Sequence, residues 1–221
     1  MNTIELFSGT KSFSKVAKRL GHSTFTIDNN KELNPDQCAD FLQLPIIDFL
    51  NEEFDLCWAS PPCTAFSVAS IGRHWGGGHR KYIPKTETAK VGLLLIDRTI
   101  EWISKVKPKI WFIENPRGVM RKIIDDLFNK HNITDVQRFT VTYCQYGDKR
   151  MKPTDIWTNC KTWTPKPMCK NGDNCHVSAP RGSKTGTQGL KGAKERGVIP
   201  EKIFFDIFDS LEGGGGNSSQ P

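Results

Sequence analysis

Short apolar stretches alternate with amphipathic stretches over the first two thirds of the chain, and this alternation constrains the fold more than any other feature. Short apolar runs predict strands, and apolar residues at helical spacing predict helices. The predicted strands are residues 4–6, 24–27, 54–59, 110–113 and 139–143, and the predicted helices are residues 13–20, 86–106 and 119–131. Because strands and helices alternate, we expect an α/β fold with a mostly parallel sheet and helices on both faces.

Polar or conformationally restricted residues follow four of these predicted strands. They are residues 7–9, Asp28, residues 61–63 and residues 114–116. In open α/β sheets, ligands bind outside the carboxyl ends of the strands. The sequence therefore predicts an active site at one rim of the sheet.

Two side chains at this rim point to chemistry, although each also has a plain structural interpretation. Cys63 follows two prolines, which stiffen the turn and can fix a thiol at the rim, but a lone cysteine is commonly a small buried hydrophobe. Glu114 ends the apolar run IWFIE, where a carboxylate is costly unless it is paired or protonated. The structural interpretation is an acid that caps or pairs with another group. Together the two suggest covalent catalysis on an electrophilic ring.

Four segments follow one another along the chain: LFSG, SPPCTAFS, ENPRG and QYGDKRMKPTDIW. In this order they resemble the C5-cytosine-specific DNA methyltransferase family, especially its short phage-borne and viral members. The resemblance implies a Rossmann-like methyltransferase fold that binds S-adenosylmethionine. The expected parts are a catalytic core in residues 1–158, a small irregular lobe in residues 159–198, a helix in residues 199–212 that packs back on the core, and a disordered tail in residues 213–221.

The resemblance also implies which residues bind the cofactor. Backbone amides at a helix N-terminus suit the methionine carboxylate. Asp28 matches the acid that binds the ribose hydroxyls, and Asp40 is either the partner of the adenine amine or an ordinary loop acid. The expected cofactor-binding residues are Phe7, Ser8, Gly9, Asp28, Asp40 and Pro62.

The implied reaction uses both rim residues as catalytic groups. The Cys63 thiolate would add to C6 of cytosine, Glu114 would hold a proton at N3, and C5 would then attack the methyl group of the cofactor. The base must leave the DNA helix for this attack. The glycine-rich basic segment 71–90 is interpreted as a mobile loop that closes over the flipped base. The expected substrate-binding residues are Pro61, Ser67, Arg73, Arg80, Lys81 and Asn115.

The chain departs from the family pattern at three places. Lys11 stands near the usual position of a second glycine in the cofactor loop, Pro116 follows the Glu–Asn pair where valine is common, and the QxRxR motif is reduced to DKRMKPTD. Arg150 and Lys152 are the basic candidates in that motif for contact with the cytosine or with the cysteine side of the site. Either could instead contact phosphate or lie on plain surface.

The region available for target recognition, residues 159–198, is short for this family. It is too short for a large hydrophobic core, which predicts short or weak sequence specificity. Its cysteines Cys160, Cys169 and Cys175 have the spacing C-x8-C-x5-C of the first three ligands of CCCH zinc fingers, and His176 follows directly. These four residues are candidate ligands of a structural zinc ion; the alternative is a set of unrelated reduced thiols.

The placement of charge indicates a partner. The net charge of +7 arises between Gln145 and Val198, where eleven Lys and Arg residues stand against four Asp and Glu residues. This favours a polyanion such as double-stranded DNA, although a solvated lysine-rich surface would give the same pattern. Membrane and secreted classes are not expected, because no apolar run is long enough to cross a bilayer and the first residues do not resemble a signal peptide. The seven cysteines are then expected as thiols or metal ligands in an intracellular protein.

The leading prediction is a DNA (cytosine-5-)-methyltransferase that acts as a monomer, in the host cytoplasm if a phage encodes it. The motifs do not separate this enzyme from a transferase that acts on tRNA cytosine or uses a modified S-adenosylmethionine, because the ring chemistry is shared. A catalytically silent nucleic-acid-binding protein of the same fold is an alternative of another class. The intact Cys63 and Glu114 argue against it.

Overall fold

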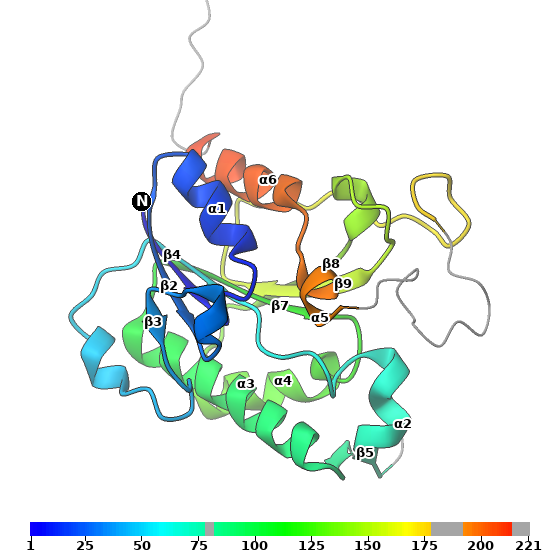
Figure 1. Cartoon of the computed structure of the whole chain (residues 1–221), viewed down its shortest axis with the longest axis horizontal. Helices are drawn as coiled ribbons and strands as arrows, with labels where there is room; N and C mark the ends of the chain where they lie inside the picture. Colours follow the sequence, from blue (N-terminus) through cyan, green and yellow to red (C-terminus); the bar gives the residue numbers. More distant parts are fainter. Residues whose placement is uncertain (78–81, 178–191, 214–221) are drawn as a thin grey trace, which may run out of the picture.

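The computed structural model describes residues 1–77, 82–177 and 192–213 of the chain. Its centre is a sheet whose seven described strands lie in the order β3–β2–β1–β4–β7–β9–β8 (Figure 1). The strands are β1 Asn2–Leu6, β2 Ser23–Asp28, β3 Gln37–Cys38, β4 Leu56–Ala59, β7 Ile110–Pro116, β8 Gln137–Thr142 and β9 Pro153–Thr158. The first five in chain order pair in parallel, whereas β9 runs antiparallel to both β7 and β8.

Helices cover both faces of this sheet (Figure 1). One face is covered by α1 Ser12–Arg19 and α6 Glu201–Glu212, and the other by α3 Glu87–Val106 and α4 Met120–Lys130. Each layer has its own buried apolar cluster: Phe13 and Phe204 belong to the first, and Ile96 and Ile124 to the second. The predicted α/β fold with a mostly parallel sheet is confirmed.

The long helix α3 illustrates how local sequence sets the limits of an element. The Thr86 side chain accepts a hydrogen bond from the backbone N–H of Ala89, which caps the helix start. Lys107 adopts a left-handed conformation at the end, directly before Pro108, which cannot continue a helix. Short 3₁₀ segments connect the larger elements: η1 Lys31–Leu33, η2 Ile46–Phe49, η3 Val68–Ser70 and η5 Tyr143–Tyr146.

The strand β9 is absent from the sequence-based expectation. Its sequence PTDIWT begins with proline and carries an acid in the middle, so it lacks the pattern of a strand. The structure nevertheless buries Asp155 completely, because Arg121 of α4 donates hydrogen bonds to both of its carboxylate oxygens. This ion pair offsets the cost of burying the charge and lets β9 fill the gap between β7 and β8.

The segment predicted as a mobile loop, residues 71–90, contains short regular elements in its described part, and its mobility stays a prediction. It contains α2 Ile71–His74 and an antiparallel pair of β5 Trp75–Gly76 with β6 Ile83–Pro84, and α3 begins at Glu87. Trp75 is buried and donates from its indole N–H to the carbonyl of Ala65. Trp75 therefore anchors the segment to the core. The loop prediction used only the glycines and basic residues of the segment and left this side chain out.

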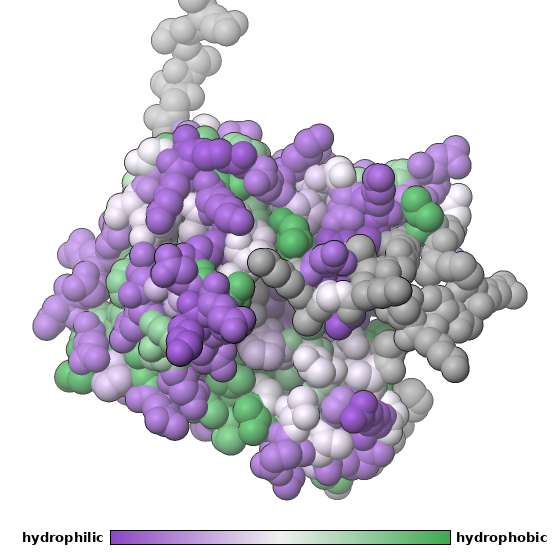
Figure 2. Space-filling model, viewed as in Figure 1, coloured by the Kyte–Doolittle hydropathy of each residue, from purple (hydrophilic) through white to green (hydrophobic). Residues whose placement is uncertain are grey.

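After β9, the regular elements among the described residues are the short helix α5 Ala193–Gly197 and α6. Residues 161–177 contain no helix or strand. Of the predicted tail, residues 213–221, all but Gly213 lie outside the described residues. None of the described helices is both long and apolar enough to span a membrane. Hydrophilic side chains gather over the α1 side of the molecule (Figure 2), where Lys15, Lys18 and Arg19 are exposed.

Candidate active site

The loop between β1 and α1, which carries the predicted cofactor residues Phe7, Ser8 and Gly9, turns sharply. Phe7 and Gly9 both adopt positive φ angles, 58° and 47°. The backbone N–H of Gly9 donates to the Asp28 carboxylate at 2.8 Å, so the acid after β2 is tied to this loop. Lys11, at the position where a glycine was expected, also has a positive φ of 56°, and its ammonium group donates to the carbonyl of Asn34.

A cavity of about 370 Å³ lies beside this loop at the carboxyl ends of the parallel strands. Four of the six predicted cofactor residues line it: Phe7, Asp28, Asp40 and Pro62. The walls combine these acids with apolar side chains from α3 and from the segment after β3, including Phe41 and Leu95. A volume of a few hundred Å³ with a few polar groups on apolar walls is typical of a small-molecule site.

The residues present fit S-adenosylmethionine. Asp28 offers carboxylate oxygens for hydroxyl groups, and Phe41 and Leu95 offer apolar surface for a purine ring. The Ser8 hydroxyl, in the same loop, is buried and has no hydrogen-bond partner in the described residues, so a polar ligand group would satisfy it. Asp40 accepts from the backbone N–H of Leu42 at 3.0 Å, a loop contact that leaves its role toward adenine a prediction.

Cys63 lies in the turn after β4 and is exposed. Desolvation by the surrounding protein raises the pKa of its thiol, and the Glu114 charge raises it further. The charges of Lys152 and Arg196 act in the opposite direction and lower it. The free protein therefore holds Cys63 as a thiol whose pKa is raised by one neighbouring acid and lowered by two neighbouring cations.

Glu114 lies in β7 and is buried. The hydroxyl of Tyr143 donates to its Oε1 at 3.0 Å. Burial and the Glu114 charge raise the pKa of Tyr143 well above its usual value, so this hydroxyl stays a donor. Sequence reasoning missed Tyr143, although its place at the end of β8 was the available signal.

Close contacts join the turns that carry Cys63 and Glu114. Asn115 donates from its side-chain amide to the carbonyl of Pro61 at 2.9 Å, and both residues are buried. Ser67 forms a β-bridge with Gly118, where an added Cβ would lie 1.9 Å from the carbonyl oxygen of Phe66. Three predicted substrate residues, Pro61, Ser67 and Asn115, thus hold the two turns together in this structure.

Comparison with known proteins assigns the family. Residues 1–134 match the family described as C-5 cytosine-specific DNA methylase. The chain is 33% identical over 230 residues to the "Probable DNA (cytosine-5)-methyltransferase" of Frog virus 3 (isolate Goorha), covering 95% of this chain and 99% of the viral protein. The chain belongs to the C-5 cytosine-specific DNA methylase family. The predicted family is confirmed, and membership implies S-adenosylmethionine as the methyl donor.

Solved structures share the fold of this DNA methylase family member. A putative DNA modification methyltransferase encoded within a prophage of E. coli aligns with a TM-score of 0.51 at 19% identity, covering 72% of this chain and 46% of the other. The Entamoeba histolytica methyltransferase EhMeth aligns with a TM-score of 0.53 at 15% identity, covering 76% and 56%. The chain spans about half the length of these solved chains.

Arg150 and Lys152, the two basic candidates in the reduced QxRxR motif of this DNA methylase, have different contacts in the structure. The Arg150 guanidinium is buried, bonds both oxygens of Asp148, and donates to the carbonyls of Arg196 and Val198. Lys152 lies with its ammonium group 4.7 Å from the centre of the Tyr143 ring and donates to the Arg196 carbonyl at 3.0 Å. The charge of Lys152 also acts on Cys63, which keeps Lys152 as the candidate for the cysteine side, and both side chains contact residues 195–198.

The remaining predicted substrate residues are basic. Arg73 lies exposed on α2. Arg80 and Lys81 lie outside the described residues. Exposed lysines of the methylase's C-terminal third include Lys149, Lys166 and Lys170.

The predicted metal ligands need one correction. Cys169, Cys175 and His176 lie together, but their fourth neighbour is Cys144, not Cys160. Cys160 is buried in the apolar cluster beside Trp163, and its sulfur contacts the Thr162 hydroxyl at 3.4 Å. The regular cysteine spacing suggested Cys160, whereas the fold brings in Cys144 from the η5 turn.

Proposed function

We propose that this protein transfers a methyl group from S-adenosylmethionine to C5 of cytosine in DNA through a covalent bond between Cys63 and C6. The observation that carries the proposal is the arrangement of neighbouring strands β4 and β7. Their carboxyl ends present Cys63 and Glu114 beside a cavity that Pro62 lines. A nucleophile, an acid and a small-molecule site thus share one rim.

The proposed roles follow from the chemistry of the ring. When bound, S-adenosylmethionine supplies an electrophilic methyl group. The Cys63 sulfur adds to C6 as its proton leaves, and Glu114 holds a proton at N3, so the electron pair moves toward C5. After methylation at C5, loss of the C5 proton and departure of the Cys63 sulfur restore the aromatic ring.

Two neighbours prepare the catalytic pair for these roles. The Tyr143 hydroxyl orients Glu114 through the hydrogen bond to Oε1. The positive charge of Lys152 favours the thiolate form of Cys63, which the desolvated turn disfavours. The base must leave the duplex to reach both groups, because a thiol that attacks C6 approaches above the ring plane.

The small recognition region supports short or weak sequence specificity. Residues 161–177 contain no regular element, and the described part of 159–198 buries few large apolar side chains besides Trp163. Action as a monomer and action in a host cytoplasm stay predictions.

The test is product analysis. The full chain is incubated with labelled S-adenosylmethionine and either duplex DNA or tRNA, and the nucleosides are identified by mass after digestion. We expect 5-methylcytosine from DNA, and Cys63→Ser should lower transfer by about 1,000-fold or more, because the attacking group is lost.

Three outcomes would contradict the proposal. Modified cytosine on tRNA alone would change the substrate, and a different product mass would change the transferred group. No product on either nucleic acid would favour a binding protein that only keeps the fold. A Cys38→Ser variant, which alters an exposed cysteine on β3, serves as the control for Cys63→Ser and should keep its activity.

A further inference from the structure

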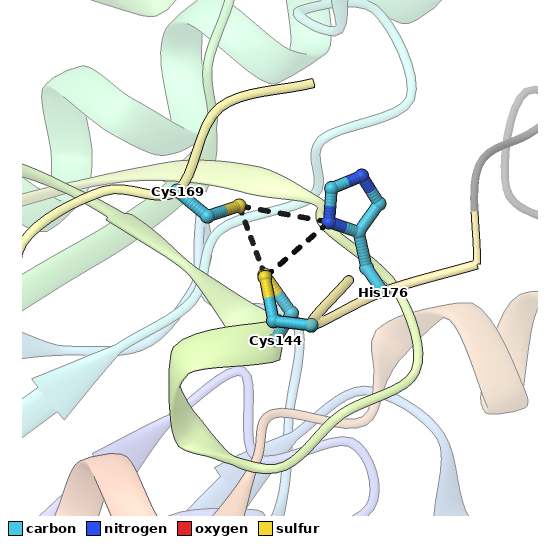
Figure 3. Close-up of side chains that lie close together, drawn as sticks. Cys144, Cys169 and His176 are labelled. Atoms are coloured by element: carbon cyan, nitrogen blue, oxygen red, sulfur yellow. Dashed lines mark hydrogen bonds between the residues drawn. The ribbon is translucent and has the colours of Figure 1, made fainter. Parts of the chain in front are cut away.

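Four potential metal ligands converge where the irregular segment meets the turn after β8. The sulfur atoms of Cys144, Cys169 and Cys175 and a ring nitrogen of His176 all lie within 4.8 Å of one another. Figure 3 shows Cys144, Cys169 and His176 pointing toward one another, with Cys144 on the η5 turn and the other two on the segment that follows β9. The ligand atoms thus come from parts of the chain more than twenty residues apart.

The distances within the group match a tetrahedral zinc site. The Cys175 sulfur lies 3.6 Å from that of Cys144 and 3.5 Å from His176 Nδ1, and the Cys169 sulfur lies 3.7 Å from the same nitrogen. Zinc bonds of about 2.3 Å to sulfur and 2.0 Å to nitrogen place tetrahedral ligand atoms about 3.7 Å and 3.5 Å apart, respectively. The Cys144 and Cys169 sulfurs, at 3.1 Å, are the closest pair and would separate slightly around an ion.

The four side chains make only weak hydrogen bonds with one another. Cys144 and Cys169 are buried, and thiols are weak hydrogen-bond donors and acceptors. His176 Nδ1 faces sulfur atoms, and its Nε2 is buried without a hydrogen-bond partner in the described residues. A cation bound at Nδ1 and the three sulfurs would turn these weak contacts into ligand bonds.

The segment that carries three of the ligands also needs a cross-link. Residues 161–177 contain no helix or strand. Besides the cysteine group, their ties to the turn include a hydrogen bond from the Cys169 N–H to the Thr142 hydroxyl and one from the Val177 N–H to the Lys149 carbonyl. Metal ions commonly replace a hydrophobic core in segments this small.

We propose that Cys144, Cys169, Cys175 and His176 bind one structural Zn²⁺ ion. The ion holds the irregular segment against the η5 turn, whose first residue, Tyr143, donates to Glu114. Three sulfurs and one nitrogen leave no open coordination position, so the site is structural rather than catalytic. The proposal does not depend on the reaction and stands if the substrate proves different.

The test measures metal in the full chain, expressed with zinc in the medium and purified without chelator. Elemental analysis should give about one equivalent of zinc per chain. Replacement by Co²⁺ should give the visible absorption of a tetrahedral thiolate site. Less than about half an equivalent of zinc, or iron in its place, would overturn the proposal.

Matched variants locate the ion. Cys175→Ser, at an exposed ligand, should lower bound zinc to about a tenth or less, and Cys144→Ser should do the same. Cys160→Ser and Cys38→Ser should keep a full equivalent, because neither sulfur belongs to the group. Zinc lost equally from Cys160→Ser and Cys175→Ser would contradict the ligand set.

Thiol counting distinguishes zinc from a disulfide between Cys144 and Cys169. The denatured, chelator-treated chain should give all seven thiols, and the native chain should gain reactive thiols when zinc is removed. Five thiols in the denatured chain would overturn the proposal in favour of an oxidised pair.

Discussion

The strand-end site and the irregular segment place their functional side chains by different means. Cys63 follows β4 and Glu114 lies near the end of the neighbouring strand β7, so the pairing of these strands sets their relative position. The Asn115 hydrogen bond to Pro61 joins the two segments. The segment 161–177 has no register and is held by individual contacts and by the four-residue ligand group. The proposed catalytic residues are thus positioned by backbone geometry, whereas the proposed recognition segment is positioned by a few side chains.

This difference predicts that substitutions in the two regions have different effects. Changes in the sheet should alter stability, because backbone pairing and burial are involved. Substitutions near the segment should mainly alter activity, through the few residues that connect it to the site, such as Tyr143 and Lys152.

The largest expected effect in the sheet region concerns Glu5 of β1. Its pKa is raised to about 7 by burial, against 4.5 for the unfolded chain. A raised carboxyl pKa means that the native state binds the proton more tightly, so stability from this group is present below pH 4.5 and is lost as pH rises to 7. The difference of about 2.5 pKa units corresponds to about 3 kcal/mol.

Glu5→Gln removes this titration. The carboxyl group accepts from the backbone N–H groups of Phe13 and Ser14 on separate oxygens, and the single amide oxygen of the variant can accept from only one of them. Urea unfolding at pH 5 and pH 8 should show the variant gaining about 2.5 kcal/mol relative to the parent protein as pH rises, because part of the effect is already present at pH 5. An identical pH dependence for the two proteins would show that Glu5 is not the group involved.

The next effect tests the backbone contact between the two catalytic turns. Gly118→Ala places a Cβ 1.9 Å from the Phe66 carbonyl, which the bridged backbone cannot avoid without moving. We expect a loss of about 2 kcal/mol in unfolding free energy, measured by urea titration. Gly72→Ala, where an added Cβ meets nothing within 4 Å, should change stability by less than about 0.5 kcal/mol. Equal losses from both would refute the close-contact explanation.

The smallest expected effect compares two tyrosines of the η5 turn. Tyr143→Phe removes the donor to Glu114 and should lower kcat by about tenfold, or about 1.4 kcal/mol, with a shift in the pH profile of the rate. Tyr146→Phe removes a hydroxyl that accepts from the Lys166 N–H and faces Asp206, away from Glu114. It should cost stability and leave kcat unchanged. A kcat loss in Tyr146→Phe as large as in Tyr143→Phe would point to general disruption of the turn.

Much of the strand-end site could be predicted from the sequence. Phe7, Asp28, Pro62, Cys63 and Glu114 each follow or end a short apolar strand, and the carboxyl ends of parallel strands meet at one rim. Because each of these positions is set by its own strand, local sequence is enough to imply that the five residues converge.

The irregular region could not be predicted in the same way. Cys144 joins Cys169 and Cys175 because β9 inserts antiparallel between β7 and β8 and returns the chain to the η5 turn. Cys160 follows β9 directly and is drawn into the apolar cluster, although its spacing matched a zinc finger. Spacing along the chain carries no information on such long-range folding.

Arg150 shows the same limit. The degraded motif makes Arg150 and Lys152 equivalent in the sequence. In the structure, Arg150 is buried against Asp148 and the Val198 carbonyl, whereas the charge of Lys152 acts on Cys63. The contacts of Arg150 with a segment more than forty residues away cannot be read from local sequence.

The most direct test of the central claim is covalent trapping on duplex DNA that contains 5-fluorocytosine. After methyl transfer to such a base, C5 carries fluorine instead of hydrogen, so no proton can leave and the Cys63 sulfur cannot be eliminated. With S-adenosylmethionine present, the protein should form a DNA adduct that survives a denaturing gel, and Cys63→Ser should form none. No adduct with the unaltered protein, or an undiminished adduct with Cys63→Ser, would contradict the account.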